Sequence, residues 1–414
     1  MMACTPDLDV VSTTSQNESQ DLLTVEEILY YPLLFLKVCG IYEHNGNKLK
    51  TRTAIGKLVF NVIFVLAYVY IDIRIIVGFI DNGDFSDQLM GRIVIAVMYI
   101  SNTLLFPFLM VTTRTRLPGI LLRFSRFQSV YGFTSDVRKL RSVVAGMSVV
   151  LSVSVVIIGV SIITLTSSRI LEESGLLINR LLPFRYEDGY IFDVVSVVEI
   201  VVTQYWSLFY DSELVVVYLL SHMIIQEFQE MTRKVDATRK KRHVSPTEIQ
   251  RMRQQHHAVS GLLQKANSVI ALNVLLTYMT LLPSTCFTVY GIVYSTLGTF
   301  DVMLLIAILV MQLLGMILMT SIGAKLHSQA HGALGGLFAL SLKNLSSEAQ
   351  YQLQMFISQL SDQTIGINVC GLFTMDGSTF LMIFGTVVTY TVVVLQIQAG
   401  SCNITHVNNC NCTV

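Results

Sequence analysis

The sequence predicts an all-α membrane protein with seven transmembrane helices. Of its 414 residues, 52% are hydrophobic and only 14% are charged, whereas soluble domains average about 25% charged residues. A helix needs about 20 apolar residues to cross the hydrocarbon core. Seven stretches meet that length, at residues 58–80, 89–111, 143–166, 191–225, 269–298, 300–322 and 378–398. We therefore expect one seven-helix transmembrane domain over residues 55–398.

The N-terminal segment, residues 1–54, precedes the first of these spans. Its apolar patch at 28–40 is too short to cross the membrane. We expect this patch to form a helix in the membrane interface or beneath the helix bundle. Asp7, Asp9 and Glu18 come before any apolar stretch, so we expect no cleavable signal peptide.

The charges of the loops orient the chain. Most of the 28 Lys and Arg residues lie in the segment before the first span and in the second and fourth loops, whereas the first loop is acidic. Because cytoplasmic loops are rich in Lys and Arg, we expect a cytoplasmic N-terminus and an extracellular C-terminus. This orientation is inverted relative to G-protein-coupled receptors. The short extracellular tail, residues 399–414, contains two acceptor sites for N-glycosylation, Asn403 and Asn411.

The fourth span carries a polar stripe on one helical face. Its members recur at steps of three and four residues. The opposite face is apolar and consists of Val194, Val195, Val197, Val198, Ile200, Val201 and Val202. Such a stripe should face the bundle interior or a wet cavity rather than lipid. The stripe consists of Ser196, Glu199, Thr203, Trp206, Tyr210 and Glu213.

Two interpretations of this stripe stay open. It forms either the wall of a ligand pocket open to the exterior or an interhelical polar network that only fixes packing. The residues that we expect to line such a pocket are Ser196, Glu199, Thr203 and Trp206, together with Tyr99, Asn102 and Tyr290 of the second and fifth spans.

The segment 346–363, between the last two spans, has the pattern of an amphipathic helix. Its apolar residues recur at steps of three and four, which places them on one face. We expect a packing or assembly helix on the cytoplasmic side. The apolar face consists of Leu345, Ala349, Leu353, Phe356 and Leu360.

The sequence contains none of the common enzymatic motifs. A Gly-rich phosphate loop, a Cys-x-x-Cys pair and a His-Glu-x-x-His motif are all missing. His256 and His257 are adjacent, and we interpret them as packing or solvated residues rather than metal ligands. We therefore expect no enzymatic activity, no cofactor, no metal site and no nucleic-acid partner.

The last span carries three polar residues in an apolar run. Thr389-Tyr390, five further residues and Gln396 follow the string CGLFTMD at 370–376. This pattern, at the end of a seventh span, resembles the signature of the insect gustatory receptor family within the seven-transmembrane insect chemoreceptor superfamily. The likeness in topology covers nearly the whole chain. One position departs from the pattern, because the family usually has Phe after the Gln and this chain has Ile397.

The resemblance implies a taste receptor that is a ligand-gated, non-selective cation channel in the plasma membrane of sensory neuron dendrites. It implies a homotetramer, or a heteromer with other gustatory receptors, embedded in membrane lipid. The ligand would be a small tastant such as a sugar or a bitter compound. In that arrangement the seventh helices line the pore, and its gate would consist of Leu395, Gln396 and Ile397. Thr389 and Tyr390 would bond to neighbouring helices.

Two other function classes fit a seven-span protein. A seven-span signalling receptor coupled to downstream transducers would normally have its N-terminus outside, and the chain has no Asp-Arg-Tyr or Asn-Pro-x-x-Tyr string. A transporter would use the polar stripe for substrate or protons. The chain shows no internal repeat and no helix-breaking Gly/Pro pair near the bilayer midplane, which disfavours a transporter.

Overall fold

The computed structural model describes residues 29–38, 59–70, 89–133, 190–294, 299–341, 345–362 and 365–408, with shorter pieces at 56, 73, 140, 142–146 and 149. Along parts of these helices only the backbone is described. The predicted third span, 143–166, lies almost entirely outside the described residues. Within the described parts, the chain is helical apart from one two-stranded hairpin.

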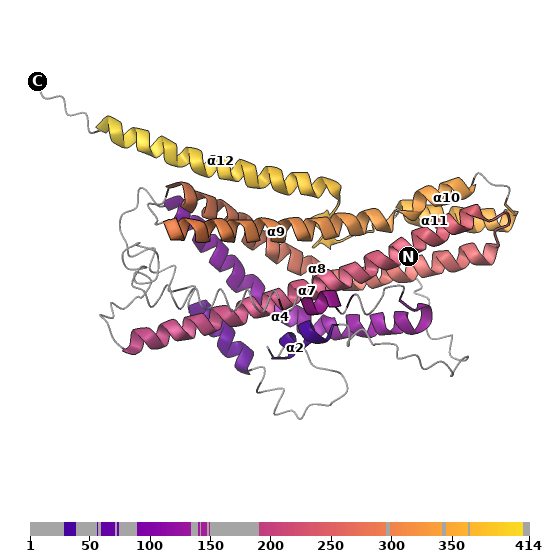
Figure 1. Cartoon of the computed structure of the whole chain (residues 1–414), viewed down its shortest axis with the longest axis horizontal. Coiled ribbons are helices and arrows are strands. Elements are labelled where there is room, and N and C mark those ends of the chain that lie inside the picture. Colours follow the sequence, from indigo (N-terminus) through magenta and orange to yellow (C-terminus); the bar gives the residue numbers. More distant parts are fainter. Residues whose placement is uncertain are drawn as a thin grey trace, which may run out of the picture.

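Within the described residues, five long helices run through the molecule; four of them contain a predicted span in full, and the helix Pro246–Tyr294 contains most of the span predicted at 269–298 (Figure 1). Two helical stretches, Leu208–Lys240 and Pro246–Cys286, are long and apolar enough to cross a membrane, and two shorter apolar helices are Val59–Tyr70 and Gly377–Val393. The five helices are α4 (Leu89–Tyr131), α7 (Tyr190–Lys240), α8 (Pro246–Tyr294), α9 (Thr299–Ala330) and α12 (Gly377–Asn408).

The long helices extend well beyond the predicted spans. The basic segments that we expected as loops are largely helical, because α4 runs on to Tyr131 and α8 already begins at Pro246. Only Lys241–Ser245 separates α7 from α8. Lys, Arg, Glu and Gln favour helices, so the charge runs of these segments are compatible with helix extensions.

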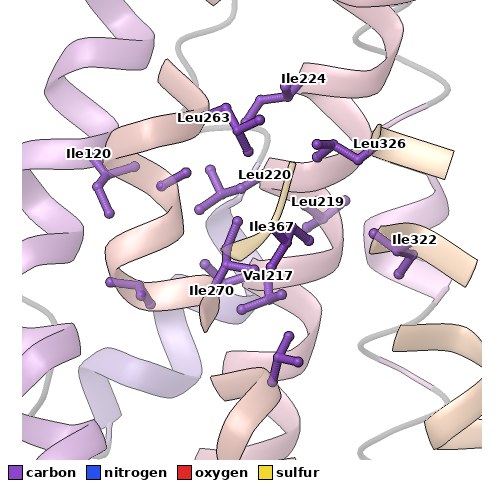
Figure 2. Close-up of a cluster of buried hydrophobic side chains, with 14 of the residues drawn as sticks. Ile120, Val217, Leu219, Leu220, Ile224, Leu263, Ile270, Ile322, Leu326 and Ile367 are labelled. Carbon is purple, nitrogen blue, oxygen red and sulfur yellow. The ribbon is translucent and has the colours of Figure 1, made fainter. Parts of the chain in front are cut away.

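The main core lies where α4, α7, α8 and α9 cross. Leu117, Phe124, Leu219, Leu263 and Leu326 are among its buried side chains. Figure 2 shows the central part of this cluster, with side chains from several helices pointing toward one another. The packing of α4 on α8 is the most extensive of the helix pairs. The core therefore spans helices that are far apart in the sequence.

A second, separate core lies at one end of the bundle, and we call it the distal core. It joins the C-terminal half of α7 and the start of α8 to α10 (Ala333–Ser341) and α11 (Ser347–Asp362) (Figure 1). Four of the five residues predicted for the apolar face of the amphipathic helix are buried there, which confirms that prediction; they are Ala349, Leu353, Phe356 and Leu360. Leu345, the fifth, is half-buried against this core.

The short N-terminal patch forms the helix α2 (Tyr30–Val38), which packs against α7. Leu29, Leu33 and Leu36 are buried in the main core, while Tyr30 and Tyr31 are exposed. Of the two placements expected for this patch, packing on the bundle is the one that the structure shows.

A β-hairpin connects the bundle to α12. Its strands are β1 (Asn368–Val369) and β2 (Phe373–Thr374), paired antiparallel. Cys370 and Gly371 both have positive φ, at 50° and 82°, which is the geometry of a tight type I′ turn. The Asn368 side chain accepts a hydrogen bond from the Gly371 N–H at 2.6 Å.

Candidate functional site

The terminal helix α12 lies at the side of the bundle, where, within the described residues, it packs mainly against α8 and α9 (Figure 1). Val387 packs against the main core, and the Thr391 hydroxyl donates to the Cys286 Sγ at 3.9 Å. Most other described side chains of α12 are exposed, including Leu381 at 73% and Phe384 at 62%. The single chain thus leaves a broad apolar surface of α12 uncovered.

The three signature residues of α12 are exposed. Thr389 and Gln396 lie seven residues apart, about two helical turns, and so share one face. That face is opposite to Val387 and Thr391, which meet the bundle. Tyr390 is 60% exposed. In the described part of the chain, neither Thr389 nor Tyr390 bonds to a neighbouring helix through its side chain. The side chains of Leu395 and Ile397 lie outside the described residues.

The start of α12 is fixed by a capping aspartate. The Asp376 carboxylate accepts hydrogen bonds from the backbone N–H groups of Ser378 and Thr379, at 2.9 and 3.0 Å, and from both of their hydroxyls. These bonds, led by that of the Ser378 hydroxyl, lower the pKa of Asp376 to about 2. The helix start has orphan N–H donors, which this side chain satisfies.

The hairpin that precedes α12 is held by α8 and α9. The Asn267 side chain on α8 donates to the Asn368 carbonyl at 3.0 Å, and His327 on α9 contacts the Ile365 carbonyl through Nδ1 at 3.0 Å. A side chain at Gly323 of α9 would place its Cβ 2.7 Å from the Cβ of Met375. Only glycine permits this close approach. The base of α12 is therefore tightly connected to the bundle.

The inner end of the predicted polar stripe faces the bundle interior. The Tyr210 hydroxyl shares a 2.6 Å hydrogen bond with the Thr277 hydroxyl of α8, and Glu213 is fully buried. On the opposite face Val198 and Val201 are about half exposed, as predicted, but Val202 is buried. Val202 belongs with the buried face because the stripe winds slightly around the helix.

The residues predicted for a ligand pocket are placed only by their backbones. Ser196, Glu199, Thr203 and Trp206 lie on α7, Tyr99 and Asn102 on α4, and Tyr290 on α8; their side chains lie outside the described part of the structure. Tyr205, next to Trp206, donates a 2.9 Å hydrogen bond to the Asn61 side chain and packs against Phe64. This contact joins α7 to the helix Val59–Tyr70.

His256 has a structural role that a sequence cannot distinguish from a solvated one. Its side chain is 1% exposed, and Nε2 lies 3.2 Å from the Ala330 carbonyl at the end of α9. Its ring packs between Phe228 and Phe356. His257 is exposed and contacts Gln359 of α11. The structure thus assigns one of the two expected roles to each histidine: His256 is a packing residue, and His257 is a solvated surface residue.

Two contacts between α8 and α9 were not predicted from the sequence. The hydroxyls of Tyr278 and Thr320 share a 2.8 Å hydrogen bond, and Gln312 donates to the Ser284 hydroxyl. These residues are scattered singly in apolar spans. The spacing of these residues along their own helices does not predict which residue of the other helix each one bonds to, because that depends on how the two helices cross.

The sequence matches the model of the 7tm chemosensory receptor family over residues 29–399. Among solved structures, the insect olfactory receptor OR5 from Machilis hrabei is similar, with a TM-score of 0.63, 14% identity, and coverage of 89% of this chain and 97% of that receptor. The same receptor in complex with eugenol gives a TM-score of 0.64, 13% identity and the same coverage. At these identities the likeness concerns the fold. No curated protein matches the sequence.

These findings confirm the predicted class, an all-helical seven-transmembrane protein. They also agree with the family resemblance of the last span, although they do not separate taste receptors from olfactory receptors. Because the family match covers nearly the whole length, the chain belongs to the 7tm chemosensory receptor family.

Proposed function

We propose that this protein is a gustatory receptor that works as a ligand-gated, non-selective cation channel, with α12 lining the pore. The observation that carries the proposal is the exposed polar face of α12. Thr389 and Gln396 lie on the side of the helix that turns away from the bundle. Polar side chains within a membrane-spanning helix rarely face lipid, because an unsatisfied polar group in hydrocarbon costs on the order of several kcal/mol.

The exposed face of α12 therefore meets water or other subunits. Four copies of α12 around one axis would satisfy both conditions: Thr389 and Gln396 would face an aqueous path, and the apolar flanks such as Leu381 and Val388 would be covered by neighbours or lipid. Amide groups of Gln396 can replace part of the hydration shell of a cation without trapping it. Leu395 and Ile397, beside Gln396, would form the apolar constriction.

The ligand site of the proposal is separate from the pore. The polar stripe enters the bundle at Tyr210 and Glu213, and the same helix carries Glu199 and Trp206 further out. An aromatic ring and an acid on one helical face suit a small molecule with hydroxyl or amine groups. The solved relative in complex with eugenol supports a small-molecule ligand for this chain as well.

The assignment to taste rests on the signature of the last span. Thr389, Tyr390 and Gln396 follow the pattern of gustatory receptors, and the loop charges favour a cytoplasmic N-terminus. The proposal places the protein in the plasma membrane of sensory neuron dendrites, as a homotetramer or together with other gustatory receptors. Asn403 lies on the last turns of α12 and Asn411 beyond the described residues.

Cysteine accessibility tests the pore assignment directly. The full chain is expressed in cells with the variant Gln396→Cys, and currents evoked by a panel of tastants are recorded before and after a charged thiol reagent. We expect block of the current in Gln396→Cys and no effect in Val387→Cys, a control on the packed face of the same helix. Equal effects in the two variants, or no block at position 396, would exclude Gln396 from the pore. Tags at both termini, detected before and after permeabilisation, check the orientation.

A further inference from the structure

A group of unsatisfied polar side chains lies deep inside the bundle, at the meeting of α4, α7 and α8. Glu213 and Asn273 are 0% exposed and Thr113 is 1% exposed. Both carboxylate oxygens of Glu213, both amide atoms of Asn273 and the Thr113 hydroxyl lack a partner that meets ordinary hydrogen-bond geometry. Buried polar groups are nearly always hydrogen-bonded in folded proteins, so such a group needs an explanation.

Each of these residues interrupts an otherwise apolar, buried line of its helix. On α7, Glu213 shares a helical face with the buried Val217 and Leu220. On α8, Asn273 shares a face with the buried Ile270, and on α4, Thr113 lies one turn from each of the buried Leu109 and Leu117. Figure 2 shows Val217, Leu220 and Ile270 close together in the interior of the bundle. The three polar residues therefore point into the main core and not toward lipid.

The three side chains face one another without forming a closed set of hydrogen bonds. Thr113 and Asn273 are the side chains placed to hydrogen-bond with the Glu213 carboxyl group, and no Lys, Arg or His in the described part of the chain is placed to pair with it. A carboxylate buried without a countercharge is costly by several kcal/mol, as an order of magnitude. This cost is removed if Glu213 takes up a proton, or if a bound cation balances its charge.

We propose that Glu213, Asn273 and Thr113 form a binding site for a small monovalent alkali cation. Two carboxylate oxygens, the Asn273 Oδ1 and the Thr113 hydroxyl supply up to four oxygen ligands from three helices, and hard cations prefer oxygen ligands. One negative charge balances one positive charge, so the occupied site is neutral. The sequence contains no His or Cys spacing typical of a metal site, and we therefore expected none.

The position of the site in the bundle decides which cation is available. Thr113 lies just beyond the predicted second span, and Asn273 lies near the predicted start of the fifth. With the predicted orientation, both lie toward the cytoplasmic side, where K⁺ predominates. Tyr210 lies less than one turn from Glu213 and is linked through Thr277 to the backbone carbonyl of Asn273. An ion at this site would thus connect the inner end of the polar stripe to α4 and α8.

Thermal unfolding of the full-length receptor in detergent tests the proposal, whether or not the protein is a channel. Samples are compared in NaCl, KCl and N-methyl-D-glucamine chloride at equal ionic strength. We expect a saturable rise of the melting temperature in Na⁺ or K⁺, of roughly 1–2 °C when the cation is at ten times its dissociation constant. The preferred ion distinguishes sodium from potassium. Equal melting temperatures in all three salts would overturn the proposal.

Three variants locate the effect. Glu213→Gln keeps the shape but removes the charge, and we expect it to abolish the cation-dependent shift. Thr113→Val removes one oxygen ligand and should raise the half-saturating concentration several-fold. Glu227→Gln is the matched control, because Glu227 is equally buried on α7 and should leave the shift unchanged. A shift that persists in Glu213→Gln, or that disappears in Glu227→Gln alone, contradicts the site. Cation-independent melting with a stable Glu213→Gln variant would instead indicate a protonated Glu213.

Discussion

Replacing Gly323 by Ala tests whether the close contact between α9 and the base of α12 is needed. The added Cβ would lie 2.7 Å from the Met375 Cβ, 2.8 Å from its Sδ and 2.9 Å from its Cε. The side-chain end of Met375 can rotate away, but its Cβ is attached to the backbone. The contact is therefore relieved only if the segment that leads into α12 moves relative to α9.

The size of the effect follows from two opposing terms. In a helix, Ala is about 1 kcal/mol more favourable than Gly, whereas overpacking a tight contact costs about 1–3 kcal/mol. Gly315→Ala on the same helix is the matched control, because the nearest atom to its new Cβ is Leu281 Cδ1 at an ordinary 3.5 Å. The control retains the helix term without the clash. Gly323→Ala should thus be less stable than Gly315→Ala by about 1–3 kcal/mol.

Thermal unfolding in detergent and ligand-evoked currents measure the two consequences. At about 1 °C per kcal/mol for a chain of this size, Gly323→Ala should melt roughly 1–3 °C below Gly315→Ala. Because the displaced segment leads directly into the proposed pore helix, we expect altered gating in Gly323→Ala and normal gating in the control. Equal melting temperatures of the two variants would refute the reasoning, since the contact at Met375 would then cost nothing.

Three further variants address other contacts. Asp376→Ala removes the cap of α12 and should destabilise the protein by about 1 kcal/mol. Because the pKa of Asp376 is lowered to about 2 in the folded protein, the capping contribution is fully present above the unfolded pKa of about 3.9 and is lost as the pH falls toward 2. The melting temperatures of wild type and variant should therefore converge at low pH. Tyr278→Phe removes the bond to Thr320 and should cost about 1 kcal/mol, with Tyr351→Phe, an exposed tyrosine, as the neutral control. Phe356→Ala leaves a cavity in the distal core and should lower the free energy of unfolding by about 3–5 kcal/mol, measured in the same melting assay. A loss of less than about 1 kcal/mol would show that the distal core contributes little to stability.

The sequence predicted the elements that follow from helical periodicity. The apolar face of α11 was found from the spacing of Ala349, Leu353 and Phe356, because a single helix determines which of its residues share a face. The inward direction of Tyr210 and Glu213 followed from the same argument. Such predictions need no knowledge of the neighbouring helices.

Other features depended on partners that periodicity does not reveal. The hairpin before α12 has strands of only two residues each, too short for an alternating pattern, and its signal is confined to the turn at Cys370 and Gly371. The helical extensions of α7 and α8 were read as loops because their charges dominate the pattern. Their apolar residues, such as Val235 and Ile249, are buried only because α10 and α11 fold back onto them.

The distribution of contacts along α12 bears on how a channel of this kind could open. At its base, the hairpin and the cap connect the helix to α8 and α9 through Asn267, His327 and the contact at Gly323. Further along, the described contacts are those of Ile383 and Val387 with the main core and the weak bond from Thr391 to Cys286. Segments with few buried contacts open at a low cost in free energy, and densely packed segments do not. A movement of α12 about its fixed base therefore requires breaking fewer interactions than a movement of the whole helix, and it would displace Gln396 more than Thr389.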